Sequence, residues 1–350
     1  MAKKVTLKTI ADKVGVSAAA VSMVLSEKHL NRFTAERIKQ INDAAREAGY
    51  EAKIKSKNFL NVVIIICPAL VNPYYSTLIQ GMERAAYQLN LRTSIFTTYW
   101  DKAQEESILK YAKKNNVLGI IYAMIPQLPE EASLLSKTIP VVAVGDLNTS
   151  MNFDTVDINN FSAGRMIARH VIELGHKNIA YITTGLDSFH SSRVQRYKGL
   201  QVECEKAGLL NMPVLFCKSL STKEELNRIT AEHDTGYELT KRCMEKMPEA
   251  TALIGINDMV AYGIIDAVLD SGKRIPEDFS VCGFDNIFPS AQRNVSLTTV
   301  EHFIFEKGSR AVSLINSKFK AKPDFNTENA VIRVEFTPKL VIRSSTAGAR

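Results

Sequence analysis

The sequence predicts a small all-α head followed by an α/β body of two doubly wound parallel-sheet subdomains. Three observations predict this fold class: a pair of short amphipathic helical segments near the N-terminus, a β-branched run VVIIIC at residues 62–67, and a regular alternation of strand and helix patterns after that run. A strand that is apolar on both faces belongs to a parallel sheet covered by helices on each side. A chain of 350 residues has room for two or three domains.

The head begins with Val5–Leu25, which predicts two short helices joined by a tight turn. Thr6 and Ser17 are placed to cap the two helices, since a hydroxyl accepts from a first-turn N–H. Gly15 ends the first helix because glycine tolerates the left-handed conformation. This order is that of a helix-turn-helix unit, whose second helix enters the major groove of DNA. An ordinary helical hairpin is the alternative. A third helix is expected over Thr34–Ala48.

The body is expected to alternate strands and helices along its length, which is typical of parallel α/β architecture. Strands are expected at 62–67, 93–98, 117–123, 139–144, 179–183, 214–217, 251–256 and 280–284. Helices are expected at 74–89, 104–115, 130–136, 163–174, 193–207, 235–246 and 259–269. Residues 219–234 are polar without a clear period and predict a loop with one helical turn at most. A ligand is expected near the carboxyl ends of the strands.

Net charge is concentrated in the head. Residues 1–60 hold 12 Lys/Arg and 6 Asp/Glu, for a net charge of +6, whereas the whole chain carries +7. A basic head on a nearly neutral body is the electrostatic footprint of a protein that binds the DNA backbone. A merely solvated basic surface is the alternative.

Several classes of protein are excluded by what the sequence does not contain. No apolar run approaches the ~20 residues that span a bilayer, and no secretory signal opens the chain, so no membrane partner is expected. The five scattered cysteines form no metal-binding spacing and favour reduced thiols in a cytoplasm. No phosphate-binding glycine loop and no catalytic constellation is present. We therefore expect no metal, no cofactor and no enzymatic activity.

Motifs along nearly the whole chain resemble the lactose/galactose repressor (LacI/GalR-type) family of bacterial transcription regulators. The resemblance is carried by VTLKTIADKVGVSAAAVSMVL in the head, NPYYSTLIQGMERAA after the first strand, and IELGHKNIAYITTG, RYKGL, GINDMVAYGIIDAVLDSGKRIPEDFSVCGFDN, LTTV and FTPKLVIRSST further on. Any one fragment is weak evidence, but the order of all of them is specific.

The resemblance implies a DNA-binding domain at 1–50, a hinge at 51–61 and a periplasmic-binding-protein-like body at 62–345. The body would consist of an N-subdomain (about 62–158 and 302–336) and a C-subdomain (about 159–301 and 337–345). Three chain crossovers would join them, near Ile158, His302 and Thr337. The resemblance further implies a homodimer that reads a near-palindromic double-stranded DNA operator.

The family pattern places the DNA contacts on the second helix and its flanks. The positions that usually read bases carry Ala18, Ala19 and Met23. These side chains cannot make the bidentate hydrogen bonds by which Arg reads guanine or Gln reads adenine. They can touch thymine methyls or admit bases by close fit, so sequence reading is expected to depend on other elements. Phosphate or base-edge contacts are expected from Thr6, Ser17, Ser22, Lys28, Asn31 and Arg32.

The bridge EAKIKSKNFLN matches the family's hinge helix, which folds in the minor groove and inserts a leucine between base pairs. Residue-by-residue matching gives DNA-contact roles to Lys53, Ser56, Lys57 and Phe59. Phe59 falls on the leucine, and a Phe wedge is acceptable because apolar side chains unstack and kink minor-groove steps. Ala52 stands where proline is common, so a flexible lysine tether to the phosphates is the alternative.

Matching positions near the ligand cleft combine aromatic rings with a few polar groups, as in a small-molecule site. These candidates are Tyr74, Tyr75, Asp146, Arg196, Asn257 and Asp285, with Arg193 and Trp100 as weaker ones. All of the six main candidates except Asp285 have a structural alternative: a core pair for the tyrosines, a turn residue for Asp146, a surface ion pair for Arg196 and a helix cap for Asn257. Neutral hydroxyl-binding groups and aromatic faces favour a saccharide. A nucleobase is the alternative, because Tyr75 falls where purine-binding relatives stack a ring.

The resulting hypothesis is a cytoplasmic, sequence-specific transcription regulator, a repressor, whose operator affinity is controlled by a small effector. The alternatives keep the DNA-binding role with a nucleobase or a protein co-regulator as effector, or describe a sugar-binding protein whose DNA head is degenerate.

Overall fold

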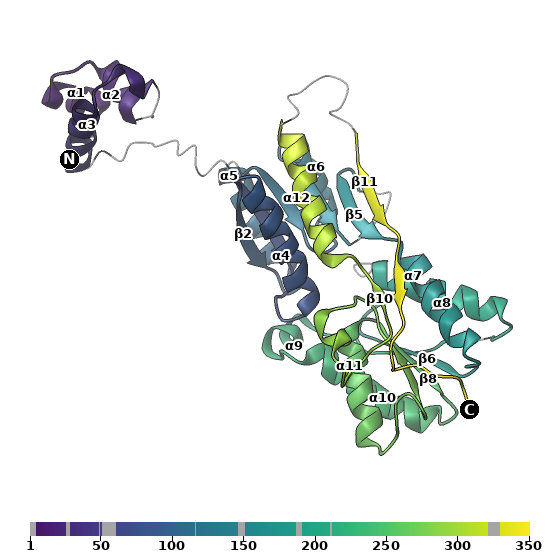
Figure 1. Cartoon of the computed structure of the whole chain (residues 1–350). Coiled ribbons are helices and arrows are strands. Elements are labelled where there is room, and N and C mark those ends of the chain that lie inside the picture. The colour runs from purple at the N-terminus through teal and green to yellow at the C-terminus, as the bar shows by residue number, and fades with distance from the viewer. Residues whose placement is uncertain are drawn as a thin grey trace. The chain divides into compact units, whose positions relative to one another are not determined.

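The computed structural model describes residues 5–25, 29–48, 50, 61–115, 117–145, 151–186, 191–210, 212–320 and 330–350. The chain divides into two compact units between Asn61 and Val62, here called the head and the body (Figure 1). Each unit has its own hydrophobic core. Within the described residues, no helix combines the length and the apolar character needed to cross a membrane. All five cysteines are free thiols.

The head is a small bundle of helices α1 (Leu7–Val14), α2 (Ala18–Leu25) and α3 (Ala35–Glu47), with a 3₁₀ turn η1 (Leu30–Arg32) before α3. Thr6 caps α1 by accepting from the backbone N–H of Thr9 at 3.3 Å. Gly15 ends α1 with a φ of +71°, and Ser17 accepts from the N–H of Ala20 at 3.1 Å. The helix pair and both hydroxyl caps expected from the sequence are confirmed.

Apolar side chains from all three helices form the core of the head. The buried members are Ile10, Ala11, Val21, Val24, Ile41, Ala44 and Ala45. They recur at helical spacing on each segment, so each helix buries one stripe and exposes the other. The exposed face of α2 is therefore fixed by the burial of Val21 and Val24 on the opposite side.

The first sheet of the body has six parallel strands in the order β11-β5-β4-β3-β1-β2. The strands are β1 (Val62–Cys67), β2 (Arg92–Thr97), β3 (Gly119–Tyr122), β4 (Val141–Val144), β5 (Asp154–Ile158) and β11 (Arg333–Phe336). The helices are α4 (Pro73–Gln88), α5 (Lys102–Asn115), α6 (Pro129–Ser136) and α12 (Ile304–Lys320).

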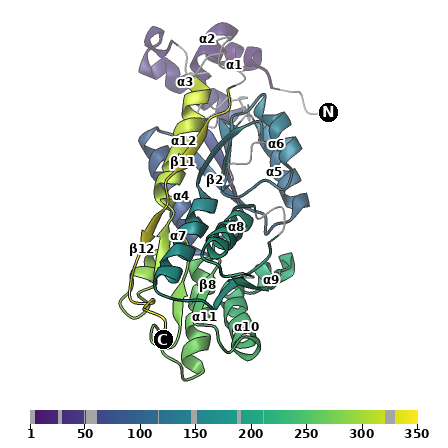
Figure 2. The same cartoon turned by 90° about the vertical axis from the view of Figure 1, so that its right-hand side faces the viewer.

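Strand β1 shows why this sheet is covered on both faces. Val63 and Ile65 pack against α4 and α12, whereas Ile64 and Ile66 pack against α5 and α6. Figure 2 shows the sheet between these two helical layers. Successive side chains of a strand point to opposite faces, so an all-apolar run needs two apolar partners.

The second sheet has four parallel strands in the order β7-β6-β8-β9: β6 (Ile179–Thr183), β7 (Val214–Cys217), β8 (Ala252–Gly255) and β9 (Ser280–Cys282). Beside β9 lies β10 (Thr299–Glu301), which pairs antiparallel with β12 (Lys339–Val341). The helices are α7 (Asn160–Glu173), α8 (Ser191–Lys206), α9 (Thr222–Asn227), α10 (Ala231–Lys246) and α11 (Asp258–Asp270), with a 3₁₀ turn η3 (Phe288–Ala291).

The chain passes between the two sheets three times: between β5 and α7, between β10 and α12, and between β11 and β12. The second and third crossovers touch, because the Phe303 ring stacks on the Phe336 ring with centroids 5.7 Å apart. Phe303 has a φ of +50°. These crossovers lie close to the three positions that the family resemblance indicates.

Most expected strands and helices are present, and β1, β6 and β7 have the expected bounds. One expectation is wrong: residues 219–234 form α9 and the first turn of α10, because Ser221 and Glu224 make a capping box that starts a helix in a polar segment. Strands β5, β10, β11 and β12 and helix α12 were not predicted from the sequence. Three of these strands have only three or four residues, too few for a visible alternation.

Candidate functional site

A cavity lies in the body where the carboxyl ends of both sheets meet. The first sheet and its loops contribute Asn72, Tyr74, Tyr75, Trp100, Ala123, Met124, Ile125, Val144, Gly145 and Asp157. The second subdomain contributes Ser192, Arg193, Arg196, Glu232, Asn257 and Asp285. Ligands of open parallel sheets bind at this edge. The cavity, here called the inner chamber, is thus the candidate ligand site.

Lys307 on α12 supports two residues of the chamber lining, Tyr74 and Asp157. Its ammonium is fully buried and donates to the Tyr74 hydroxyl at 2.8 Å and to Asp157 Oδ1 at 3.1 Å. Burial alone would lower the pKa of Lys307, but the Tyr74 hydroxyl and the Asp157 carboxylate raise it above its usual value. The ammonium therefore stays charged, and its hydrogen bond holds the Tyr74 hydroxyl in place.

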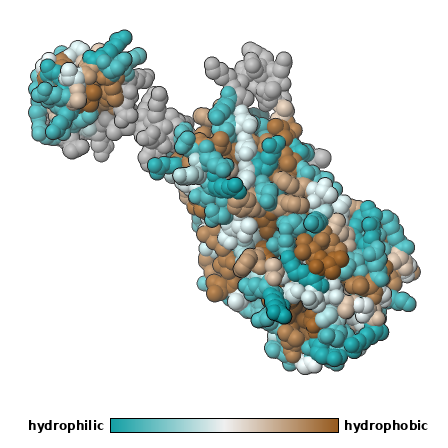
Figure 3. All heavy atoms as spheres, in the orientation of Figure 1, coloured by the Kyte–Doolittle hydropathy of each residue, from teal (hydrophilic) through white to brown (hydrophobic). Residues whose placement is uncertain are grey.

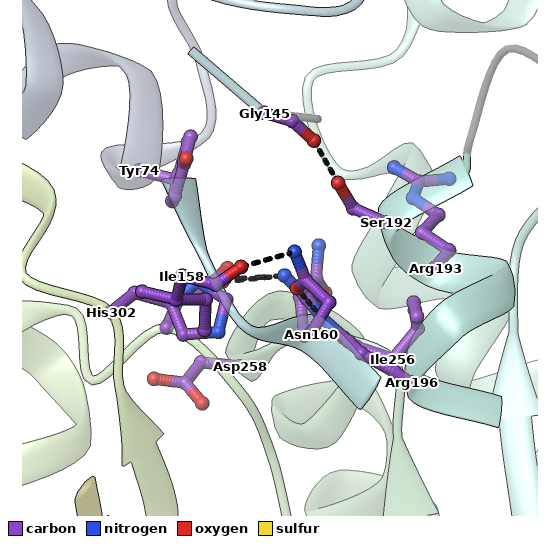
Figure 4. A network of polar contacts seen from close by, with 12 residues as sticks. Tyr74, Gly145, Ile158, Asn160, Ser192, Arg193, Arg196, Ile256, Asp258 and His302 are labelled. Atoms are coloured by element: carbon purple, nitrogen blue, oxygen red, sulfur yellow. Dashed lines mark hydrogen bonds and ion pairs between the residues drawn. The ribbon is translucent and has the colours of Figure 1, made fainter. Parts of the chain in front are cut away.

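Arg196 joins the two subdomains through a second network (Figure 4). Asn160 faces both Asp157 and Arg196: its Nδ2 donates to Asp157 Oδ2 at 2.7 Å, and its Oδ1 accepts from Arg196 Nε at 2.9 Å. Arg196 Nη1 also donates to the carbonyl of Ile256 at 2.7 Å. Its guanidinium lies over the Phe284 ring, 5.0 Å from the centroid. Arg196 is therefore a buried organising residue of the site.

Asp285 lies at the end of this network in a strained backbone conformation. Its φ is +114°, a value that side-chain-bearing residues rarely adopt and that clusters at functional sites. Its Oδ1 is 3.2 Å from His302 Nδ1 and 3.8 Å from Arg196 Nη2. Burial raises the pKa of Asp285 to about 8, although the Arg196 guanidinium opposes the shift. Burial and the cations Arg196 and Lys307 hold the pKa of His302 well below its usual range.

Glu232 on α10 connects the two subdomains at the mouth of the inner chamber. Its Oε2 accepts from Asn72 Nδ2 at 2.6 Å, and its Oε1 accepts from Asn257 Nδ2 at 3.0 Å and from Arg193 Nη2 at 3.4 Å. Ser192 makes a second link, because its hydroxyl donates to the carbonyl of Gly145 (Figure 4).

Each cation of the chamber lies beside a carboxyl group. Lys307 lies beside Asp157, Arg196 beside Asp285 and Arg193 beside Glu232. Arg196 also donates to Asn160 and to the Ile256 carbonyl, so both arginines of the described lining are already engaged by protein groups that a phosphate would have to displace. The chamber offers hydroxyl, amide and carboxylate groups between aromatic rings, a combination suited to a neutral ligand that both donates and accepts hydrogen bonds.

The structure brings together five of the six expected ligand residues: Tyr74, Tyr75, Arg196, Asn257 and Asp285. Asp146 lies outside the described residues. The Asn257 amide oxygen also caps α11, as it accepts from the Val260 N–H at 2.9 Å. The two tyrosine rings meet edge to face, 5.3 Å apart, and pack on the first core. Both weaker candidates, Arg193 and Trp100, line the chamber as well.

Seven polar residues of the site were not found from the sequence: Asn72, Asp157, Asn160, Ser192, Glu232, His302 and Lys307. Two signals were visible. Asp157 is a carboxylate in the otherwise β-branched run TVDI, and Lys307 lies among Ile304, Gly308 and Ala311 on the apolar stripe of α12. A charged residue at a core position is unusual unless it has a partner.

The candidate DNA-contacting residues of the head that the structure describes are exposed, apart from Met23. Ala18, Ala19 and Ser22 are exposed on α2 and Met23 is half-buried. Thr6, Ser17, Asn31 and Arg32 are exposed as well, and the first two hydroxyls also serve as caps. Lys28, Lys53, Ser56, Lys57 and Phe59 lie outside the described residues.

Comparison with known proteins places this arrangement in a family. Residues 168–346 match the model of the periplasmic binding protein-like domain. The HTH-type transcriptional repressor PurR of Haemophilus influenzae is 28% identical over 349 residues, which cover 97% of this chain and 98% of that protein. The chain belongs to the lactose/galactose repressor family. This family membership and the periplasmic-binding-protein-like class of the body were both expected from the sequence and are confirmed.

Solved structures of the lactose/galactose repressor type share the fold. A LacI-family transcriptional regulator from Silicibacter pomeroyi superposes with a TM-score of 0.78 at 24% identity, covering 98% of this chain and 99% of that chain. The transcriptional regulator CelR in complex with cellobiose superposes with a TM-score of 0.69 at 19% identity, covering 98% of this chain and 100% of that chain. These relatives are named as transcription regulators, not as enzymes.

Proposed function

We propose that this family member is a repressor that binds a near-palindromic operator as a homodimer in the bacterial cytoplasm, and that a saccharide in the inner chamber sets its operator affinity. The observation that carries the proposal is the hydroxyl-binding chamber between the two sheets, whose arginines are already engaged by protein groups. The repressor PurR supports the regulatory role, and the cellobiose complex of CelR supports a sugar as ligand.

The chemistry of the lining favours vicinal hydroxyls over an anion. A sugar hydroxyl both donates and accepts, so one ring can bind a carboxylate, an amide and a hydroxyl at once. Glu232, Asn257 and Ser192 present those three groups on one side of the chamber. Tyr75 presents an apolar face to the other side, as is common in sites for rings.

The proposed regulation is a population shift between two arrangements of the subdomains. The Asn72–Glu232 and Ser192–Gly145 contacts join the subdomains in the arrangement described here. A ligand that replaces these contacts would bind this arrangement of the subdomains and a second arrangement with different affinities. Only such a difference in affinity shifts the populations of the two arrangements. Operator binding by a dimer depends on the spacing of two heads, so it would respond to that shift.

A gel-shift titration with a panel of mono- and disaccharides tests this function. At least one sugar is expected to change operator affinity in the wild type and to lose that effect in Asp285→Asn. The matched control is Asp266→Asn, because Asp266 is exposed on α11 and pairs with His233 outside the chamber. The proposal fails if no sugar changes operator affinity, or if the Asp285 variant responds like the wild type.

A purine nucleobase is the second candidate effector. The similarity to PurR favours it, as do the paired rings of Tyr74 and Tyr75 at the chamber wall. Isothermal calorimetry with purine bases beside the sugar panel separates the two candidates. Binding of a base without binding of any sugar would replace the saccharide in the proposal and leave its DNA-binding part unchanged.

Dimer formation is proposed from the surface of the body as well as from the family. Tyr87 and Phe288 are 84% and 80% exposed. Figure 3 shows patches of apolar residues among hydrophilic ones on the visible face of the body. Large exposed apolar groups often mark contact surfaces. Sedimentation analysis should give a dimer, and a monomer at micromolar concentration would contradict this part of the proposal.

A further inference from the structure

A second pocket lies directly beside the inner chamber and is here called the outer pocket. Its lining has seven apolar residues and the two aromatic residues Tyr75 and Trp100; the apolar ones are Pro68, Ala69, Val71, Leu220, Ile229, Ala231 and Met259. Val71 and Ile229 are 49% and 74% exposed, so this pocket opens to solvent along an apolar rim. Nothing in the chamber chemistry described above uses these residues.

The two cavities are separated by a single layer of side chains. Asn72, Tyr75, Trp100, Arg193 and Glu232 line both of them. Asn72 comes from the loop after β1, and its hydrogen bond to Glu232 at 2.6 Å closes the layer between the subdomains. A ligand that displaced this hydrogen bond between Asn72 and Glu232 would connect the two cavities.

The cationic groups that line the outer pocket are already paired with carboxylates. Arg228 lies 2.5 Å from Asp234, and His233 lies 2.9 Å from Asp266. Glu225 also lines this pocket, and burial raises the pKa of its carboxyl to about 7. An anionic occupant would therefore have to break an existing ion pair. An apolar occupant would instead remove the exposed side chains of Val71 and Ile229 from water, which is favourable in proportion to the area covered.

We propose that the ligand is a glycoside with two chemically different ends. Its sugar ring occupies the inner chamber, and its aromatic aglycone occupies the outer pocket, with the glycosidic oxygen between Asn72 and Glu232. This inference rests on the saccharide proposed above and adds to it the class of the substituent at the anomeric carbon.

Calorimetry of the full-length protein with matched methyl and phenyl glycosides of common hexoses and pentoses tests the inference. The phenyl compound is expected to bind about tenfold more tightly than the methyl compound of the same sugar, because only its ring reaches the outer pocket. Ile229→Ser should bring that ratio close to one. Since Ile229 is largely exposed, this variant is expected to fold. Leu134→Ser, on the exposed side of α6, is the matched control and should keep the tenfold ratio.

The outcomes separate this inference from the proposed function. If methyl glycosides bind and phenyl glycosides bind no better, the outer pocket is not an aglycone site and the saccharide proposal stands. If Ile229→Ser weakens methyl and phenyl compounds by the same factor, the inference is likewise overturned. If neither glycosides nor free sugars bind, the saccharide proposal fails and this inference fails with it.

Discussion

Lys307 shows how much of the chamber depends on one side chain. Its ammonium contacts Tyr74 and Asp157, which lie 233 and 150 residues away in the chain. Lys307 has no exposed surface, and Asp157 is 2% exposed. Removing one member of such a buried pair leaves the other charge uncompensated, which costs more than the pair itself contributes.

Lys307→Met should lower the free energy of unfolding by about 3–5 kcal/mol, because Asp157 is left as a buried carboxylate without its cation. Urea denaturation measures the change. Lys110→Met is the matched control, since Lys110 pairs with Glu106 on the exposed face of α5 and should cost about 0.5 kcal/mol at most. Equal costs for the two variants would contradict the structural role given to Lys307.

Asp285 is expected to make stability depend on pH. Its folded pKa is raised to about 8, from an ordinary value of 3.8, so the folded state holds a proton that the unfolded state releases. Its contribution is therefore fully present below pH about 4 and is lost as pH rises through about 8. Over that window the wild type should lose stability that Asp285→Asn retains. Parallel stability curves of the two proteins in urea would contradict this prediction.

At the scale of elements, paired helices approach so closely that glycine is required where they cross. A Cβ on Gly199 of α8 would meet the carbonyl of Phe161 on α7, and one on Gly164 of α7 would meet the carbonyl of Arg196. Backbone atoms cannot move aside as a flexible side chain can. Arg196 lies one turn before Gly199 on α8, so the contact between α7 and α8 keeps Arg196 in the chamber lining.

Gly199→Ala should destabilise the body by about 1–3 kcal/mol, the usual cost of overpacking. It should also weaken ligand binding, because α8 must move and Arg196 moves with it. Thermal unfolding and calorimetry measure the two effects. Gly348→Ala is the control, as a Cβ there would meet only the Leu174 carbonyl at 3.9 Å. Unchanged binding by a folded Gly199 variant would contradict the positioning role of this contact.

At the scale of the whole molecule, charge and ligand chemistry are divided between the two units. Residues 1–60 carry a net charge of +6, whereas the polar groups of the chamber belong to the body. α2 exposes two alanines where other side chains would read bases, so contacts to the DNA backbone should supply most of the affinity.

Arg32→Gln should therefore weaken operator binding and reduce the slope of log K against log salt by about 0.9, the loss of one phosphate contact. Fluorescence anisotropy over a salt series measures the slope. Lys113→Gln removes an equally exposed charge from α5 of the body and should leave the slope unchanged. Equal slopes for wild type and Arg32→Gln would place Arg32 outside the DNA interface.

The head and the alternating core of the body could be predicted because their signals are local. Thr6, Gly15 and Ser17 act on neighbours within a few residues, so capping rules are enough to bound α1 and α2. Every residue of the run at 62–67 is apolar, so the run by itself predicts a strand that is covered on both faces. Candidates that follow a strand, such as Asn257 and Asp285, could be found because the carboxyl ends of parallel strands meet at one edge.

The sequence by itself determined the helix-turn-helix head, the charge of that head, the parallel strands and the polar residues at strand ends. Only the tertiary structure decided how those residues pair: Lys307 with Asp157, Glu232 with Asn72, and Asp285 with His302. These partners are 150, 160 and 17 residues apart in the chain. Their contacts depend on three crossovers and on helix packing, which no local pattern encodes. The outer pocket likewise exists only because α9, α10 and the loop after β1 come together in space.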